Sequence, residues 1–342
     1  MKKQNFGKRN FDLLVIVTFL TGVLLIISSY AWFYASLDVK VDFLKLETSS
    51  ETGLFISLDG IEFGSTVEIS EETLINQLRK TYPGNLSQWA SRGLFSMSSN
   101  GISNNNTDKF DMFTSIKYDF KENDSSGKRY LTVIKTEEEK INSMNHFIAF
   151  DIFLKNVSGS PKSDNLYLVK GTGVNYMNPE IDDYDGTINS IRIGLVKIGS
   201  VPLKSHINTI QTIKCFNNCH SLIYETNSTI HSEGSIERAK EFGVNLVDGV
   251  YTPTYSLIKE GRYLDPATGQ AGSGVELDTE HFIKQNTITS FENPIFQIPN
   301  AITKVRVYVW LEGQDMDNLS TSARGEKVSI NINFYKDLAG YY

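Results

Sequence analysis

Two cysteines, Cys215 and Cys219, are the residues of this chain whose type and spacing most directly allow covalent chemistry. They lie in the stretch CFNNC, where two asparagines favour a tight turn. In an oxidising compartment the two thiols can form a local disulfide bond, and in a reducing one they stay free. A zinc site would need more ligands than the adjacent His220, and no second cysteine pair or HxxxH sequence exists. We therefore expect a disulfide between Cys215 and Cys219.

The sequence lacks the common motifs of catalytic chemistry. None of the five histidines lies in HExxH or a similar metal-binding spacing, and there is no GxSxG serine-hydrolase motif and no P-loop. Fragments resemble those of penicillin-binding enzymes, with SxxK at 256–259 and SDN at 163–165. Their order is reversed, however, and 170–173 reads KGTG and not KTG. We expect no enzymatic activity and no catalytic residue.

A hydrolase acting on wall glycans is the alternative from a different class, because such an enzyme needs little more than two carboxyl groups. Asp278 and Glu280 are the candidate pair. Nothing in the sequence sets the distance between their carboxyl groups, and ordinary surface charge accounts for them equally well.

Two acidic segments, 180–186 (EIDDYDG) and 312–318 (EGQDMDN), have enough oxygen atoms to be considered for calcium. In the first, Ile181 takes the first ligand position of an EF-hand loop and Arg192 the last, which is the wrong chemistry at both places. The second segment directly follows an apolar strand pattern. We expect both segments to be solvated acidic turns, with calcium in a surface loop as the alternative, and we predict no cofactor.

The elements that would position these groups are mostly β-strands. In 304–312 (KVRVYVWLE) every second residue is aliphatic, which predicts a half-buried antiparallel strand. The segments 327–335 (KVSININFY), 146–155 (HFIAFDIFLK) and 189–199 (NSIRIGLVKIG) repeat the pattern. Shorter strands are expected at 44–47, 54–58, 66–69, 130–134 and 166–169.

Helices are sparse. Ser70 can cap a helix with Leu74 and Leu78 on its apolar face, ended by the Pro83-Gly84 pair. A second short helix is expected at 235–242. The polar segment 98–108 (SSNGISNNNTD) is expected to be an exposed loop. Together these patterns predict a mainly β fold, an antiparallel, jelly-roll-like β-sandwich with one or two short helices.

The N-terminus divides into a basic leader, 1–12, and an apolar run, 13–34. About 22 residues of helix span roughly 33 Å, enough to cross a bilayer. Because Lys and Arg beside a membrane segment stay in the cytoplasm, the run predicts a cytoplasmic leader and an extracellular domain over 35–342, either single or made of two subdomains. A secretory signal has a similar pattern, and cleavage between Ala31 and Trp32 is the alternative to a retained transmembrane helix.

A third interpretation of the N-terminus is a type IV prepilin. Gly7 and Asp12 have the spacing of its cleavage glycine and acidic residue, but Lys8 and Arg9 occupy positions where such pilins carry hydrophobic residues.

The chain has a net charge of -7, and residues 1–12 contribute four positive charges and one negative, so the rest carries about -10. An acidic domain of this kind is a poor ligand for nucleic acid, and none is expected as a partner.

Several segments resemble a known but poorly characterised group of surface proteins from Firmicutes and related wall-less bacteria. The resemblance lies in 28–60, where an apolar helix ending in YAWF runs into a first strand, and in 146–156 and 188–197. It is most specific in 305–318 (VRVYVWLEGQDMDN), which is followed by SININF. Many members carry a cysteine after the LEGxDxD block, where this chain has Asn318. More loosely, the start is similar to the SipW-type signal and first strand of the TasA and camelysin group.

The resemblance implies a surface β-sandwich that assembles with other subunits, and it transfers no catalytic residue. With the N-terminal pattern it leads to the hypothesis of a membrane-anchored cell-surface structural or adhesive protein. Its partners would be the lipid bilayer, through 13–34, and copies of itself or other surface proteins. A secreted filament or matrix subunit, released by signal cleavage, is the alternative.

Overall fold

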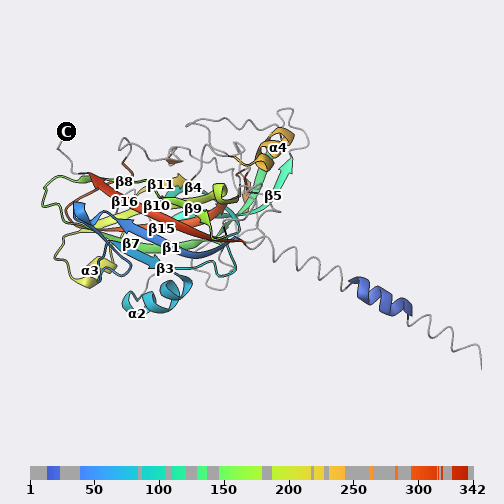
Figure 1. Cartoon of the computed structure of the whole chain (residues 1–342), viewed down its shortest axis with the longest axis horizontal. Helices are drawn as coiled ribbons and strands as arrows, with labels where there is room; N and C mark the ends of the chain where they lie inside the picture. The colour runs from blue at the N-terminus through green and yellow to red at the C-terminus, as the bar shows by residue number, and fades with distance from the viewer. Residues whose placement is uncertain are drawn as a thin grey trace, which may run out of the picture.

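The computed structural model describes residues 14–23, 39–83, 87–104, 109–120, 129–136, 146–178, 187–216, 219–226, 231–242, 262–264, 282–283, 294–313, 315, 317–318 and 326–337. Most of them belong to two β-sheets that form one body, whereas a helix over 14–23 precedes it in the chain (Figure 1). This mainly β, mostly antiparallel architecture confirms the predicted fold class. The jelly-roll connectivity stays a prediction.

The smaller sheet is built around the last long strand, β16 (Lys327–Asp337). This strand pairs in parallel with β1 (Lys40–Thr48) and antiparallel with β8 (Asp164–Leu168) and β9 (Gly173–Tyr176). The sheet ends at β14 (Phe296–Ile298) beside β8, and at β3 (Thr66–Ile69) beside β1. The first and last described strands of the body therefore lie side by side.

The larger sheet is built around β15 (Ile302–Glu312), which pairs antiparallel with β10 (Ile191–Val201) and β7 (Ile148–Asn156). On the far side of β10 lie β11 (His220–Glu225) and β13 (Phe282–Ile283), and β7 also pairs with β2 (Leu54–Ser57). The remaining strands extend from the end of β15 in the order β4 (Ser96–Asn104), β5 (Lys109–Phe120), β6 (Arg129–Thr136) and β12 (Arg262–Leu264).

One hydrophobic core fills the space between the sheets. The smaller sheet contributes side chains such as Leu44 and Ile330, and the larger sheet contributes Phe150, Ile193 and Val307. Apart from Leu44, whose segment 44–47 was expected only as a short strand, these are inward positions that the alternation in the sequence predicted for the four long strands. The shared core makes the described body a two-layer β structure.

The outer face of β15 differs from the prediction. The sequence predicts a half-buried strand, but every residue of β15 is buried. Tyr308 and Trp310 belong to a second hydrophobic cluster on that face, where the Phe110 ring stacks on Tyr308 with centroids 4.8 Å apart. Gly194 makes room for this ring, since a Cβ there would lie 2.4 Å from it. The prediction was wrong because this second cluster, with side chains from β4 and β5, covers the polar-looking face.

The helices are short. Residues 71–81 form the helix predicted after Ser70, with a π-helical centre (η2, Thr73–Gln77) that continues as α2 (Leu78–Thr81). The Ser70 hydroxyl accepts a hydrogen bond from the backbone N–H of Thr73. The second predicted helix begins two residues earlier than expected, as α4 (Glu233–Phe242), and α3 (Ile207–Gln211) was not predicted. Two 3-10 turns are η1 (Ser50–Thr52) and η4 (Thr187–Ser190).

The expected loop at 98–108 is in large part a strand. Residues up to Asn104 belong to β4, which pairs antiparallel with β5, and both Ser98 and Ser99 are buried. Pairing with β5 satisfies backbone groups of this polar segment, and small hydroxyl side chains fit against a neighbouring layer. The polar composition of this segment alone therefore did not distinguish a strand from a loop.

The helix over 14–23 has exposed apolar side chains, with Phe19 70% and Leu14 64% exposed. Within the described residues, no helix is long and apolar enough to span a membrane. The proposed cleavage site at Ala31 and Trp32 lies outside the described residues.

Candidate functional site

The acidic segment at the end of β15 forms a buried cluster of charged side chains, which we call the carboxylate cluster. It consists of Arg192 from β10, Glu225 from β11, His231 before α4, and Asp315 and Asp317 after β15. Arg192 and Asp317 are 0% exposed, and Asp315 is 1% exposed. The expectation of a solvated turn at 312–318 was therefore wrong for these residues, because the turn folds inward beside β10.

Arg192 lies at the centre of the carboxylate cluster. One of its terminal nitrogens forms ion pairs with Glu225, at 3.0 Å, and with Asp315. Its other terminal nitrogen donates a hydrogen bond to the backbone carbonyl of Asn189 at 2.7 Å. The guanidinium thereby joins two neighbouring strands to the segment that follows β15. Its fixed fork of donors suits this bridging role better than a lysine would.

Asp317 connects the carboxylate cluster to helix α4. Its carboxylate accepts hydrogen bonds from the backbone N–H and the hydroxyl of Ser232, each at 3.0 Å, and lies 3.1 Å from Nδ1 of His231. The Ser232 hydroxyl in turn accepts a bond from the backbone N–H of Ser235, which caps the helix. The aspartate therefore fixes the start of α4 against the sheet.

The other polar residues of the acidic segment also have structural partners. The indole N–H of Trp310 donates to the Glu312 carboxylate at 3.0 Å, and the Asn318 amide donates to the Ser96 hydroxyl and the Glu312 carbonyl, both at 2.8 Å. The segment WLEGQDMDN thus ties the end of β15 to the start of β4. This contact network gives the segment a structural role that its sequence did not reveal.

Burial and the neighbouring charges shift two pKa values in the carboxylate cluster. Burial raises the pKa of Asp315 to about 7, with the charges of Asp317 and Glu225 adding to the effect against that of Arg192. Burial lowers the pKa of His231. The hydrogen bond and charge of Asp317, together with the charges of Asp315 and Glu225, raise this pKa by more than burial lowers it, so the net shift is upward.

We expect the protein to lose stability as the pH rises from 5 to 8. The folded state holds a proton on Asp315 that the unfolded chain releases near pH 4, and a proton on His231 that the unfolded chain releases near pH 6.5. Both contributions are present at lower pH and are lost as the pH rises through the folded-state pKa values. The free energy of unfolding in urea should fall by about 1–3 kcal/mol over this range.

The Asp315→Asn variant should flatten this pH dependence, because the amide cannot ionise. Asp42→Asn, at an exposed position on β1, is the matched control and should leave the slope unchanged. A free energy of unfolding that stays constant or rises between pH 5 and 8 would show that the carboxylate cluster does not titrate as described.

A second buried cluster lies on the same outer face of the larger sheet, on strands β7 and β15. Asp151 forms ion pairs with Lys304, at 3.0 Å, and with Arg306, at 2.9 Å, and accepts a hydrogen bond from the Tyr82 hydroxyl at 2.9 Å. Burial raises the pKa of Asp151, but the charges of Arg306 and Lys304 and their hydrogen bonds outweigh it, and the net direction is downward. The Asp151 carboxylate is therefore charged and anchors Tyr82, next to α2, to the sheet.

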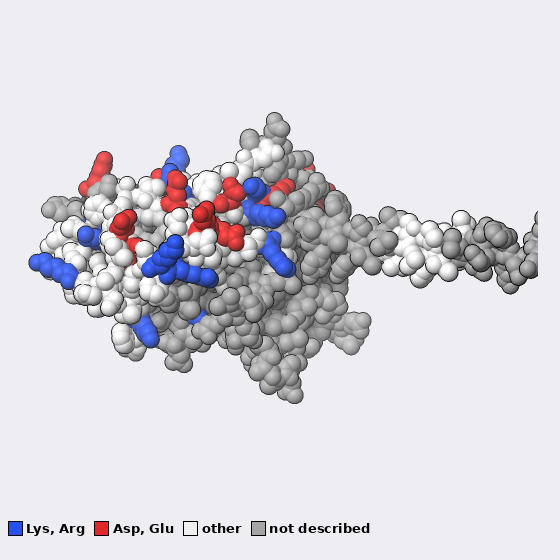
Figure 2. Space-filling model, turned by 90° about the horizontal axis from the view of Figure 1, so that it is seen from below, with Lys and Arg blue, Asp and Glu red and all other residues white. Residues whose placement is uncertain are grey.

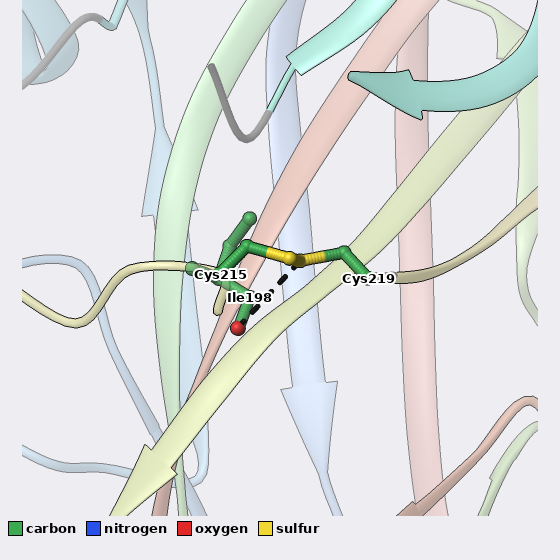
Figure 3. The surroundings of a disulfide bond; sticks show 3 residues. All are labelled: Ile198, Cys215 and Cys219. Atoms are coloured by element: carbon green, nitrogen blue, oxygen red, sulfur yellow. Dashed lines mark hydrogen bonds between the residues drawn. A yellow bond between two sulfur atoms is a disulfide. The ribbon is translucent and has the colours of Figure 1, made fainter. Parts of the chain in front are cut away.

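The two cysteines are joined in a disulfide bond with their Cα atoms 5.9 Å apart. The bond closes the loop between α3 and β11, and Figure 3 shows it beside β10, where Sγ of Cys219 lies 3.7 Å from the carbonyl oxygen of Ile198. Inside this loop, the side chain of Phe216 is 91% exposed. The disulfide therefore holds an exposed aromatic side chain in a short, closed loop.

A surface hollow of about 580 Å³ lies between the β2–β3 connection and the helix at 71–81. Its lining includes Phe63, Thr66 and Val67 from the region of β3, and Gln77 and Leu78 from the helix. Because β3 is the end strand of the smaller sheet among the described residues, the hollow lies next to a strand edge. A strand edge with adjacent side-chain pockets suits an extended peptide segment.

Several residues singled out in the sequence lie outside the described part of the chain. These are the acidic segment 180–186 and the carboxylate pair Asp278 and Glu280, so the calcium and glycan-hydrolase alternatives stay untested there. Among the residues that the structure does describe, no group of three or more acidic, histidine or cysteine side chains is arranged to hold a metal ion.

The face of the molecule in Figure 2 carries Lys, Arg, Asp and Glu side chains intermixed over its described residues. A nucleic-acid interface would show a continuous basic stripe, which this described surface does not have.

In comparisons with known protein families, curated proteins and solved structures, nothing matches this chain. Fold and site define a two-layer β protein with buried ionic clusters.

Proposed function

We propose that the protein is a structural or adhesive protein of the cell surface, held in the membrane by its N-terminal segment. The domain over 35–342 would be a β-sandwich of the jelly-roll type on the outer face, and the leader, 1–12, would lie in the cytoplasm. Its activity would be binding, to copies of itself or to other surface components, with no catalytic step.

The exposed apolar helix over 14–23 is the observation that carries this proposal. Five of its aliphatic residues, including Leu14 and Leu20, are more than half exposed, and so is Phe19. A helix that is apolar on all sides is stable only when something apolar surrounds it, and a bilayer provides that environment. The helix lies inside the apolar run 13–34, which is long enough to span.

Two surface features support a binding role. The hollow beside β3 offers backbone groups at a strand edge together with side-chain pockets, which is the arrangement used in recognition by strand addition. The disulfide loop presents Phe216 on a constrained backbone, which lowers the conformational entropy lost on binding. Aromatic side chains of this kind dominate the energetics of many interfaces.

We expect the full-length protein to float with phospholipid vesicles in a density gradient. Replacing Leu20 with lysine places a charge in the apolar run, at a cost of about 3 kcal/mol if that position lies near the centre of the bilayer. The Leu20→Lys variant should therefore shift substantially to the unbound fraction.

Leu20→Ile is the matched control and should float like the unmodified protein, because it keeps an apolar side chain of the same size. Equal flotation of the lysine and isoleucine variants, or no flotation of any form, would contradict membrane insertion through this segment.

The mass of the mature N-terminus separates the two versions of the proposal. An intact Met1 indicates an anchor, and a start at Trp32 indicates a released filament or matrix subunit.

A further inference from the structure

Three polar side chains meet inside the core at one end of the two sheets. In β16 and in β7, alternate residues face the shared core, and the last inward-facing residue of each strand is polar: Lys336 in β16 and Asn156 in β7. Asp164, the first residue of β8, lies beside them. All three are 0% exposed. We call them the Lys336 triad.

The distances within the Lys336 triad place an amine against an amide. Nζ of Lys336 donates to Oδ1 of Asn156 at 2.6 Å, so with a C=O bond of about 1.23 Å it is at most about 3.8 Å from the amide carbon. Oδ2 of Asp164 lies 3.3 Å from Nζ of Lys336 and 2.9 Å from Nδ2 of Asn156. A single carboxyl oxygen therefore contacts both the amine nitrogen and the amide nitrogen.

The orientation of the Asn156 amide is set by its surroundings. Besides Asp164, the amide nitrogen faces the backbone carbonyl oxygens of Ile298, at 3.2 Å, and Pro299, at 3.1 Å. Three acceptors on one side and the lysine on the other allow only one assignment of the amide oxygen and nitrogen. The carbonyl side of Asn156 is thus held towards Lys336.

The Lys336 triad is closed off from solvent. Gly53, at φ +76°, lies over it, and a Cβ at this position would lie 2.7 Å from the Val157 carbonyl oxygen and 3.9 Å from Nζ of Lys336. Oδ1 of Asp164 is buried without a hydrogen-bond partner among the described residues. This oxygen is therefore the one polar atom of the Asp164 carboxyl group that the surrounding described residues leave available for a reaction step.

We propose that Lys336 and Asn156 form an intramolecular isopeptide bond, with Asp164 as the catalytic residue. The arrangement contains what the reaction needs: an amine within reach of the amide carbon, a carboxamide held by hydrogen bonds, a carboxyl group in contact with both nitrogens, and burial that keeps bulk solvent away. The reaction needs no oxidant, metal or other co-reactant.

The atoms balance in three proton transfers. Asp164 first takes a proton from the Lys336 ammonium, and the free amine attacks Cγ of Asn156 to form the Nζ–Cγ bond. Asp164 then passes its proton to Nδ2 and accepts the second proton that Nζ releases, while the Cγ–Nδ2 bond breaks. One molecule of ammonia leaves, and the chain loses about 17 Da.

The proposed bond would join the two sheets covalently. Asn156 belongs to the larger sheet and Lys336 to the last strand of the smaller one, and the two residues are 180 positions apart in the chain. A cross-link that closes so long a segment removes much of the freedom of the unfolded chain. Such a bond would suit a protein exposed to proteases and shear, although the chemistry does not depend on the membrane anchor.

The test is the intact mass of the full-length protein, purified in detergent, followed by peptide mapping. The expected result is a loss of about 17 Da and a branched peptide that joins Lys336 to position 156. A protein of unmodified mass would overturn the proposal, leaving the triad as a buried ion pair. A 17 Da loss without the branched peptide would overturn it equally.

Variants identify the reacting groups. Lys336→Arg and Asp164→Asn should keep their unmodified masses, and Asn156→Asp should lose about 18 Da because water replaces ammonia as the leaving group. Lys327→Arg, which changes an exposed lysine of the same strand, is the matched control and should still lose about 17 Da. A cross-link that persists in Lys336→Arg would contradict the assignment.

Discussion

Replacing Arg192 with methionine is expected to lower the free energy of unfolding by about 3–5 kcal/mol. The side chain is fully buried, and its ion pairs with Glu225 and Asp315 offset part of the cost of burying those two carboxylates. Methionine fills a similar volume but carries no charge, so the carboxylate cluster would hold negative groups without its central cation. Urea unfolding at pH 7, followed by circular dichroism, measures the difference.

Arg79→Met is the matched control, because Arg79 is exposed in α2, and it should change the free energy by less than about 0.5 kcal/mol. Adding Asp315→Asn to the Arg192→Met variant should recover part of the lost stability, since the amide requires neither a buried charge nor the uptake of a proton on folding. Equal stabilities of the Arg192 and Arg79 variants would contradict the role given to the cluster.

The second large effect is expected at Asp151. Asp151→Ala should cost about 3–5 kcal/mol, because it leaves Lys304 and Arg306 buried without the carboxylate that pairs with both. It also removes one of the two acceptors of the Tyr82 hydroxyl and leaves only the Gln211 carbonyl, so α2 should become more susceptible to proteolysis. Unfolding in urea and limited proteolysis would measure the two consequences.

The chain offers a matched control for burial alone. Asp42 forms an ion pair with Lys327 at 3.0 Å, the same distance as the pair between Asp151 and Lys304, but on the surface. Asp42→Ala should cost less than about 1 kcal/mol, since water replaces the lost partner. Similar losses in both variants would mean that burial does not set the energy of these pairs.

The sequence predicted the long strands well because their alternation reflects the shared core directly. The inward positions Val328 and Ile330 in β16, and Ile148 and Phe150 in β7, are buried as the pattern required. The helix after Ser70 was also predicted, since its cap and apolar face are local signals. Features that depend on neighbouring residues in the chain were thus accessible without a structure.

Features that depend on distant segments were not accessible. The outer face of β15 looks polar at Arg306, yet it is covered by a second hydrophobic cluster that includes Phe110 of β5. Asp315 and Asp317 looked like surface charges, and only the approach of Arg192 and His231 explains their burial. Acidic residues after a strand do not by themselves distinguish a solvated turn from a buried cluster.

The Lys336 triad had a sequence signal that the strand predictions did not use. The predicted strands ended at 335 and 155, one residue short of Lys336 and Asn156. Extending each alternation by one step would have placed a lysine and an asparagine at inward-facing positions. A charged residue in phase with an apolar stripe is therefore worth testing as a buried group.

The central claim is that the N-terminal segment holds the β domain on the outside of the cell. Trypsin treatment of intact cells that produce the protein tests it most directly, with the released and the retained fragments identified by mass spectrometry. The account predicts that peptides from 35–342 are released or trimmed by the protease, while the apolar run 13–34 stays with the membrane fraction. Full protection of the domain until the cells are lysed, or recovery of the uncleaved chain in the soluble cell extract, would contradict it.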